Sequence, residues 1–191
     1  MTIIHLKDSP YKLPWTHTYS RGSTPINFIV VHWAGSASSA EQLYRYLQGT
    51  RVAVSTGWGV DPTGAYQYLP ETRVSYHAGK ANKWSVGVDF TQSPLLNDLW
   101  RYSSRAGVAA MDNTTGRGDK QCLSIGTEEL NHMCELIHFL CDKYNIPMDL
   151  PTTTDVLSTP FEKIKGVVCH SHLTNQKWDI APWWSTLRKA L

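Results

Sequence analysis

Two apolar runs, far apart in the chain, each end in a histidine. The first run is Phe28–Val31, followed by His32, and the second is Val167–Cys169, followed by His170. A short unbroken apolar run is typical of a strand that is buried on both faces of a sheet. The pattern therefore predicts two buried strands, and if both lie in one sheet, their two imidazoles meet at the same edge.

Between these runs the pattern predicts a helix and a hairpin. Ser38 or Ser39 can cap a helix whose apolar residues recur at three- and four-residue steps up to Gly49. Residues 52–69 alternate weakly on both sides of the turn sequence Asp-Pro-Thr-Gly at 61–64. Alternation around a strong turn signal predicts a β-hairpin.

The second half of the chain adds a strand, a long helix and an irregular segment. Residues 84–90 are a strand candidate, and a helix opens at Thr127 and ends at 145–147. Its predicted apolar stripe consists of Leu130, Cys134, Ile137, Cys141 and Tyr144. Residues 92–125 have weak periodicity and several Gly, Asn and Ser residues, which predicts a long surface excursion that could act as a lid or a substrate wall.

Composition narrows the class of protein. A chain of 191 residues can bury the core of one domain without a disulfide or a structural metal, so a metal site here would be catalytic. The net charge is only +2, and the chain has nothing like the basic stripe of a nucleic-acid binder, so no nucleic-acid partner is expected. The N-terminus has no signal-peptide pattern and no segment resembles a membrane span, which predicts cytoplasmic synthesis and no membrane insertion.

The four cysteines are predicted to be free thiols. They are Cys122, Cys134, Cys141 and Cys169. They lack the paired CxxC spacing of a zinc ribbon or a redox motif, and cysteines of this kind are usually buried as small hydrophobic residues.

The two strand-ending histidines have a third candidate partner in Asp179. A catalytic zinc usually has three protein ligands and keeps one position open, and His32, His170 and Asp179 fit that kind of site. One carboxylate against a dication leaves net positive charge, which polarises a carbonyl and lowers the pKa of water toward ~7. Lys177 shares a face with Asp179 if the segment is extended, so its ammonium could stabilise an oxyanion, although a solvated surface lysine is the alternative.

His172 competes with His170 as the second ligand. If the strand continues, the two side chains share a face. We choose His170 because it directly follows the apolar run, and we expect His172 to hydrogen-bond a ligand or to face the substrate. The remaining histidines, His5, His17, His132 and His138, are expected to be structural.

Five segments, in order, resemble the zinc-dependent N-acetylmuramoyl-L-alanine amidases, a family that includes phage T7-type lysozymes, cytosolic recycling amidases and peptidoglycan recognition proteins. Phe28–Trp33 resembles the strand of the first ligand, and Asp61–Glu71 resembles the family's turn and Q-x-L-P-E segment. Tyr76–Gly79 resembles W-H-A-G, Ser85–Asp89 resembles S-I-G-I-E, and His170–Asp179 resembles the closing ligand segment.

The resemblance covers residues 27–179 and implies a fold and a metal site. The implied fold is α/β, with a central mixed β-sheet flanked by helices and zinc in a groove at the edge of the sheet. The implied ligands are His32, His170 and Asp179, with Lys177 as the cation that stabilises the transition state. One catalytic domain is expected over residues 1–191, with its core at about 27–180 and no separate wall-binding domain.

The resemblance also implies further site residues. Asp89 occupies the position of a glutamate that handles the proton of water in recycling members, although it could instead be structural. Other members use a tyrosine, where this chain has Thr56. His77 is expected to contact the substrate or to anchor its loop. Trp33 and Trp58 are candidates for the wall of the substrate groove.

The implied activity is zinc-dependent hydrolysis of the amide bond between N-acetylmuramic acid and L-alanine in peptidoglycan. A phage endolysin is the first biological interpretation: a monomer made in the host cytoplasm that reaches the wall through a pore. A bacterial cytosolic muropeptide-recycling amidase is the nearest alternative. A recognition module that binds peptidoglycan without cutting it is the alternative of another class, and the presence of all three candidate ligands argues against it.

Overall fold

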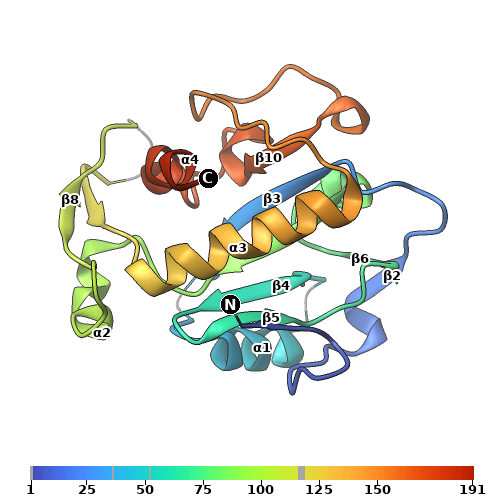
Figure 1. Ribbon diagram of the computed structural model, residues 1–191, viewed down its shortest axis with the longest axis horizontal. Coiled ribbons are helices and arrows are strands. Elements are labelled where there is room, and N and C mark those ends of the chain that lie inside the picture. The colour runs from blue at the N-terminus through green and yellow to red at the C-terminus, as the bar shows by residue number, and fades with distance from the viewer. Residues whose placement is uncertain (1, 36, 52, 116–118) are drawn as a thin grey trace.

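The computed structural model describes residues 2–35, 37–51, 53–115 and 119–191. A six-stranded mixed sheet lies at its centre (Figure 1). Its strands, in spatial order, are β1 (Ile3–Ile4), β5 (Gly64–Gln67), β4 (Trp58–Asp61), β7 (Ser85–Phe90), β3 (Phe28–Trp33) and β10 (Gly166–Cys169). Only the β4–β5 hairpin is antiparallel within this sheet. The predicted mixed sheet is therefore confirmed.

The two predicted apolar strands are direct neighbours. β3 and β10 run parallel, with Val31 opposite Cys169, so the residues that follow them emerge at the same edge. Every residue of the two strands except Trp33 is buried, because layers of side chains cover both faces of the sheet. On the other side of β3, β7 is parallel as well and places Asp89 opposite His32.

The predicted hairpin is present, but its first strand is shorter than expected. β4 begins at Trp58, and residues 53–57 form no strand, while position 52 lies outside the described residues. The alternation at 53–57 was too weak to place the start of the strand.

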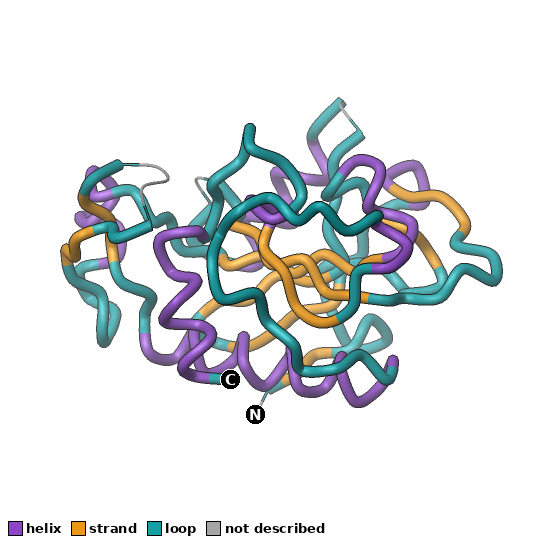
Figure 2. Tube along the Cα trace, turned by 90° about the horizontal axis from the view of Figure 1, so that it is seen from above, coloured by secondary structure: helices purple, strands orange, loops and turns teal. Residues whose placement is uncertain are grey.

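Helices cover both faces of the sheet. α3 (Thr127–Tyr144) and α4 (Trp184–Ala190) lie together along one side of the strands, as Figure 2 shows. α1 (Ala40–Gly49) packs against Tyr68 on the other side, and the Ser39 hydroxyl caps it by accepting from the amide of Gln42. The helices flank the sheet as predicted.

The buried stripe of α3 is shifted from the predicted one. Met133, Leu136, Ile137 and Leu140 are fully buried, whereas Leu130, Cys134 and Tyr144 lie at the margin of the core. Two overlapping apolar stripes satisfy the same helical spacing, and packing on the sheet selects between them. The helix ends as expected, at Asn145, which takes the left-handed conformation that asparagine tolerates.

Two smaller antiparallel ribbons lie outside the central sheet. One pairs β2 (Thr18–Ser20) with β6 (Arg73–Ser75). The other pairs β8 (Ala110–Asp112) with β9 (Gln121–Leu123) inside the predicted excursion at 92–125, which also holds the short helix α2 (Leu99–Tyr102). Figure 1 places this excursion at one end of the molecule, beyond the start of α3.

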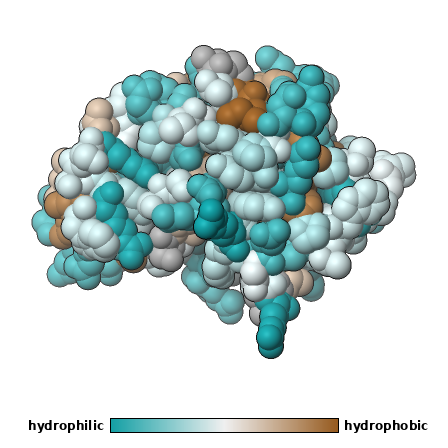
Figure 3. Space-filling view, turned by 90° about the horizontal axis from the view of Figure 1, so that it is seen from below, coloured by the Kyte–Doolittle hydropathy of each residue, from teal (hydrophilic) through white to brown (hydrophobic). Residues whose placement is uncertain are grey.

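None of the helices in the described ranges is long and apolar enough to cross a membrane. The face in Figure 3 is covered mainly by hydrophilic and neutral residues, with hydrophobic residues in small separate patches. All four cysteines are free thiols, as predicted, and all but Cys134 are buried.

Candidate active site

Three side chains from distant parts of the chain converge at the edge of the sheet where β3 and β10 end. The Nδ1 atoms of His32 and His170 lie 3.2 and 3.1 Å from the same Oδ2 atom of Asp179. One ligand-type atom from each residue lies within 4.8 Å of the others. The two imidazole rings are nearly perpendicular, with centroids 4.8 Å apart. The structure thus brings together all three residues that the sequence analysis named as metal ligands.

Asp179 is held by its backbone and by its neighbours. Its φ of 32° lies in the left-handed region, where aspartate is tolerated better than most residues. The preceding ring of Trp178 packs against Trp33, with centroids 5.6 Å apart, which fixes the loop. Burial by itself would raise the pKa of Asp179, but the imidazoles of His170 and His32 in contact with its carboxylate hold that pKa well below its ordinary value. The carboxylate is therefore charged at neutral pH.

Two imidazole nitrogens and a carboxylate oxygen are the donor set of an open zinc site. The two nitrogens and the oxygen lie next to one another, and a cation placed among them would be bound by all three. The residues present therefore fit a divalent metal, with room for a further ligand on the open side of the groove.

His77 contacts the site from the side opposite Asp179. Its Nδ1 lies 3.0 Å from Nε2 of His32, and its Nε2 lies 3.2 Å from the hydroxyl of Ser85. Burial, together with the nearby His32 and His170, lowers the pKa of His77 well below its ordinary value, so the ring is neutral. His77 also borders the groove, so its predicted contact with substrate stays a prediction.

Asp89 and Lys177 face the same groove as the three convergent residues. Asp89 is buried next to His32 in the sheet, and its burial raises the pKa of its carboxyl, while a hydrogen bond from Thr56 opposes that rise. Lys177 is exposed at the rim. A carboxylate on the floor and an ammonium at the rim thus flank the candidate metal site, and their roles as proton acceptor and oxyanion partner stay predictions.

The groove extends away from these residues along α1. A cavity of about 260 Å³ over the three convergent residues shares Trp33, Asp89 and Lys177 with one of about 560 Å³. The walls of the larger cavity include Trp33, Gln42, Leu43, Tyr46, Leu47 and Val54. The excursion contributes Trp100 and Arg101 to a neighbouring pocket that shares Gln42 with this cavity. Trp33 thus lines the groove, and its predicted contact with substrate stays a prediction.

Two predicted substrate contacts are wrong. His172 is fully buried, accepts a hydrogen bond from the amide of Cys169 and donates one to the carbonyl of Thr153. The chain turns into a 3-10 helix at His170–His172, so the strand does not continue and the two histidines point to different places. Trp58 is also fully buried, in the core on the α3 side of the sheet, because its position in β4 faces away from the groove.

Sequence reasoning missed the residues that support the site. Ser85 and Gly87 lie under His77, and the side chain of Thr56 forms a hydrogen bond with Asp89. The alternation Ser85-x-Gly87-x-Asp89 was the available signal, because alternate residues of a strand share one face.

Of the histidines expected to be structural, His132 lies with Nδ1 3.1 Å from the carbonyl oxygen of Asp61.

The fold is similar to those of several solved amidase structures. A mutant endolysin from Bacillus subtilis aligns with a TM-score of 0.61 at 18% identity, covering 100% of this chain and 98% of that one. The catalytic domain of XlyA aligns with a TM-score of 0.57 at 20% identity, covering 100% and 99%. The amidase AmiD from E. coli, in complex with an anhydro-muramyl peptide substrate, aligns with a TM-score of 0.55 at 17% identity, covering 90% and 60%.

Sequence comparison gives the family directly. No curated protein matches the chain. The sequence profile of the N-acetylmuramoyl-L-alanine amidase family matches residues 22–182, which include every convergent residue described above. Since the match spans most of the chain, this protein belongs to the N-acetylmuramoyl-L-alanine amidase family.

Proposed function

We propose that this protein hydrolyses the amide bond between N-acetylmuramic acid and L-alanine in peptidoglycan, with zinc held by His32, His170 and Asp179. The observation that carries the proposal is the convergence of these three side chains on the floor of an open groove that also contains Asp89 and Lys177. Family membership supports the same reaction.

The chemistry assigns a separate task to each flanking residue. Zinc, when bound, would polarise the scissile carbonyl and lower the pKa of water. Asp89 accepts the proton of the attacking water, because a buried carboxylate with a raised pKa is a better base than an exposed one. Lys177 donates a hydrogen bond to the carbonyl oxygen as its negative charge develops.

Collapse of the tetrahedral intermediate completes the reaction. The carbon–nitrogen bond breaks, and Asp89 returns its proton to the nitrogen of the departing L-alanine. The products are a muramyl carboxylic acid and a peptide with a free amino terminus. The water is consumed, and both side chains end in their starting protonation states.

The biological role that we propose is that of a phage endolysin, with the described fold as one monomeric catalytic domain that reaches the wall through a pore. The solved structures with similar folds include an endolysin, which supports this role. A muropeptide-recycling amidase would perform the same reaction on soluble fragments, as the complex of AmiD with an anhydro-muramyl peptide illustrates.

The test is product analysis on purified peptidoglycan. We expect new L-alanine amino groups and no new reducing ends, loss of activity with a chelator, and recovery when zinc is added back. Asp179→Asn should be inactive before the chelator is added, in its presence and after zinc is added back. Comparable digestion of intact sacculi and soluble muropeptides separates the two roles: an endolysin digests sacculi, and a recycling amidase prefers fragments. A folded, zinc-loaded protein that releases no amino groups would contradict the enzymatic proposal.

A further inference from the structure

One face of β7 lies beneath the candidate metal site. Ser85, Gly87 and Asp89 are alternate residues, so their side-chain positions point to the same face. The parallel register sets Gly87 opposite Val30 and Asp89 opposite His32 on β3. His77 lies over this face, in contact with both strands.

The hydrogen bonds on this face run in one direction. The carbonyl of Ala81 can only accept, so the hydroxyl of Ser85, 2.8 Å away, donates its single proton there. The Ser85 oxygen must then accept from Nε2–H of His77. In a neutral imidazole the other nitrogen is an acceptor, so Nδ1 of His77 accepts from Nε2–H of His32. His32 therefore presents the lone pair of its Nδ1, and not a proton, to Asp179 and His170.

Gly87 is needed for this arrangement. A Cβ atom at this position would lie 2.7 Å from Cγ and 2.8 Å from Nδ1 of His77, closer than nonbonded carbon atoms approach. The ring can rest on β7 and reach His32 only because residue 87 has no side chain. A methyl group there would push His77 away from His32.

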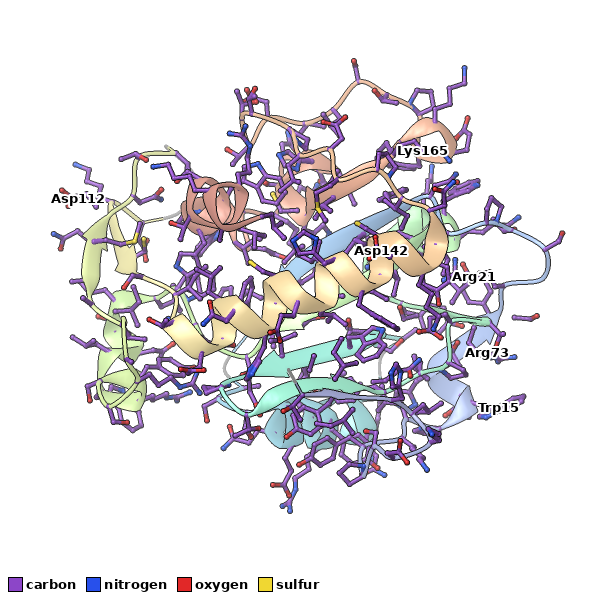
Figure 4. The ribbon with its side chains drawn as sticks, in the orientation of Figure 1. Trp15, Arg21, Arg73, Asp112, Asp142 and Lys165 are labelled. Atoms are coloured by element: carbon purple, nitrogen blue, oxygen red, sulfur yellow. The ribbon has the colours of Figure 1, made fainter. Side chains whose placement is uncertain are left out.

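Two further side chains hold the backbone on either side of this hydrogen-bonded chain. The side-chain oxygen of Asn82 accepts from the amides of His77 and Ala78, which holds the His77 backbone. Arg21, labelled in Figure 4, donates to the carbonyls of Lys83 and Ser85 and so holds the start of β7. The His77 ring and the Ser85 hydroxyl are thus positioned from both sides.

We propose that His77, Ser85 and Gly87 form a positioning relay that fixes the tautomer and the ring orientation of His32, so that its Nδ1 is free to bind the metal. The inference rests on the proposed metal site. It makes His77 a positioning residue, and it gives each polar or small residue of the Ser-x-Gly-x-Asp alternation a task at the site. Partners of this kind keep a ligating imidazole in place.

The first test measures zinc affinity by competition with a fluorescent chelator. Ser85→Ala, Gly87→Ala and His77→Leu should each bind zinc about 10- to 100-fold more weakly than the wild type, as expected for the loss of a ligand's hydrogen-bond partner. His77→Asn, whose side-chain oxygen can occupy the position of Nδ1, should recover part of the loss. Val86→Ala is the matched control, because Val86 lies in the same strand but packs into the core on the opposite face.

The second test reads the tautomer directly. Nitrogen-15 NMR of the His32 ring should find the proton on Nε2 in the zinc-free wild type and a mixture of tautomers in zinc-free Ser85→Ala. Thermal unfolding of the zinc-free proteins establishes that each variant is folded, and Ser85→Ala, which removes one oxygen atom, is the mildest change.

The outcomes separate the two proposals. Wild-type affinity for zinc in folded Ser85→Ala and His77→Leu would overturn the relay. So would a rise in KM with unchanged zinc affinity in His77→Leu, because that result would identify a substrate contact. A wild-type protein that binds no zinc would instead overturn the proposed function.

Discussion

Two acidic residues of this protein are each held by partners far away in the sequence, but in opposite ways. Glu129 is fully buried, and its carboxylate accepts from the amides of Thr91 and Gln92 and forms an ion pair of 2.7 Å with Arg105. Asp179 is only partly buried, and its Oδ2 atom meets two imidazole nitrogens. The partners of Glu129 are amides and a guanidinium, which can only donate hydrogen bonds. The partners of Asp179 are imidazoles, which can instead offer a lone pair to a metal.

The difference separates a structural ion pair from a cluster of candidate metal ligands. Arg105 also donates to the carbonyl of Ser38, so the Glu129 cluster fastens the excursion at 92–125 to α3 and to the start of α1. The hydrogen bonds of the Glu129 carboxylate are made within the protein, and its side chain is not exposed. At Asp179, the groove leaves one side open, and the partners themselves are ligand types. Each cluster holds a carboxylate beside side-chain nitrogens, and the kind of partner distinguishes them.

The largest expected effect comes from removing the charge of Asp179. Asp179→Asn keeps a residue that tolerates the left-handed backbone, and it should lose zinc. Hydrolysis should then fall by about 10³-fold or more, since a metal contributes several kcal/mol to stabilising the transition state. Metal analysis after dialysis and the release of amino groups measure the two effects. Stoichiometric zinc in this variant would remove Asp179 from the ligand set.

Glu129→Gln should instead damage the fold. Breaking a buried ion pair on one side leaves the Arg105 charge uncompensated, so the free energy of unfolding should fall by about 3–5 kcal/mol. Urea unfolding of the zinc-free proteins measures this loss. Glu128→Gln, one residue away and exposed, should change stability by less than about 0.5 kcal/mol. If folded Glu129→Gln bound zinc more weakly, the two clusters would not be independent.

Lys177→Ala tests the rim of the groove. Loss of an oxyanion partner typically lowers kcat by about 10²- to 10³-fold, and the metal should remain bound because Lys177 is not among the convergent residues. Lys189→Ala, an exposed lysine in α4, is the control and should retain full activity. Metal loss in the Lys177 variant would mean that Lys177 is needed to hold the metal and is not only an oxyanion partner.

The smallest effect is expected at His172, the histidine that the structure removes from the groove. His172→Leu leaves the amide of Cys169 and the carbonyl of Thr153 without their partner, which should cost about 1–3 kcal/mol of stability. Zinc affinity and kcat of the folded variant should equal those of the wild type. A change in KM would restore the prediction that His172 faces the substrate.

Much of the fold was predictable because local patterns carry it. The apolar runs at 28–31 and 167–169 identified β3 and β10, and the turn at 61–64 located the hairpin. The candidate site followed from the same runs, since a histidine directly after a buried strand must emerge at its edge. His172 was misplaced because nothing in the local sequence indicates that the chain turns into a 3-10 helix at His170.

The sequence by itself determined which segments are buried strands, where α1 and α3 begin and end, and which side chains have metal-ligand chemistry. Only the tertiary structure decided that β7 lies beside β3, that Trp58 faces the core, and that His77 rests on Gly87 to reach His32. The physical reason is that the period of a pattern fixes which residues share a face, while the order and register of strands depend on contacts between segments that are distant in the chain.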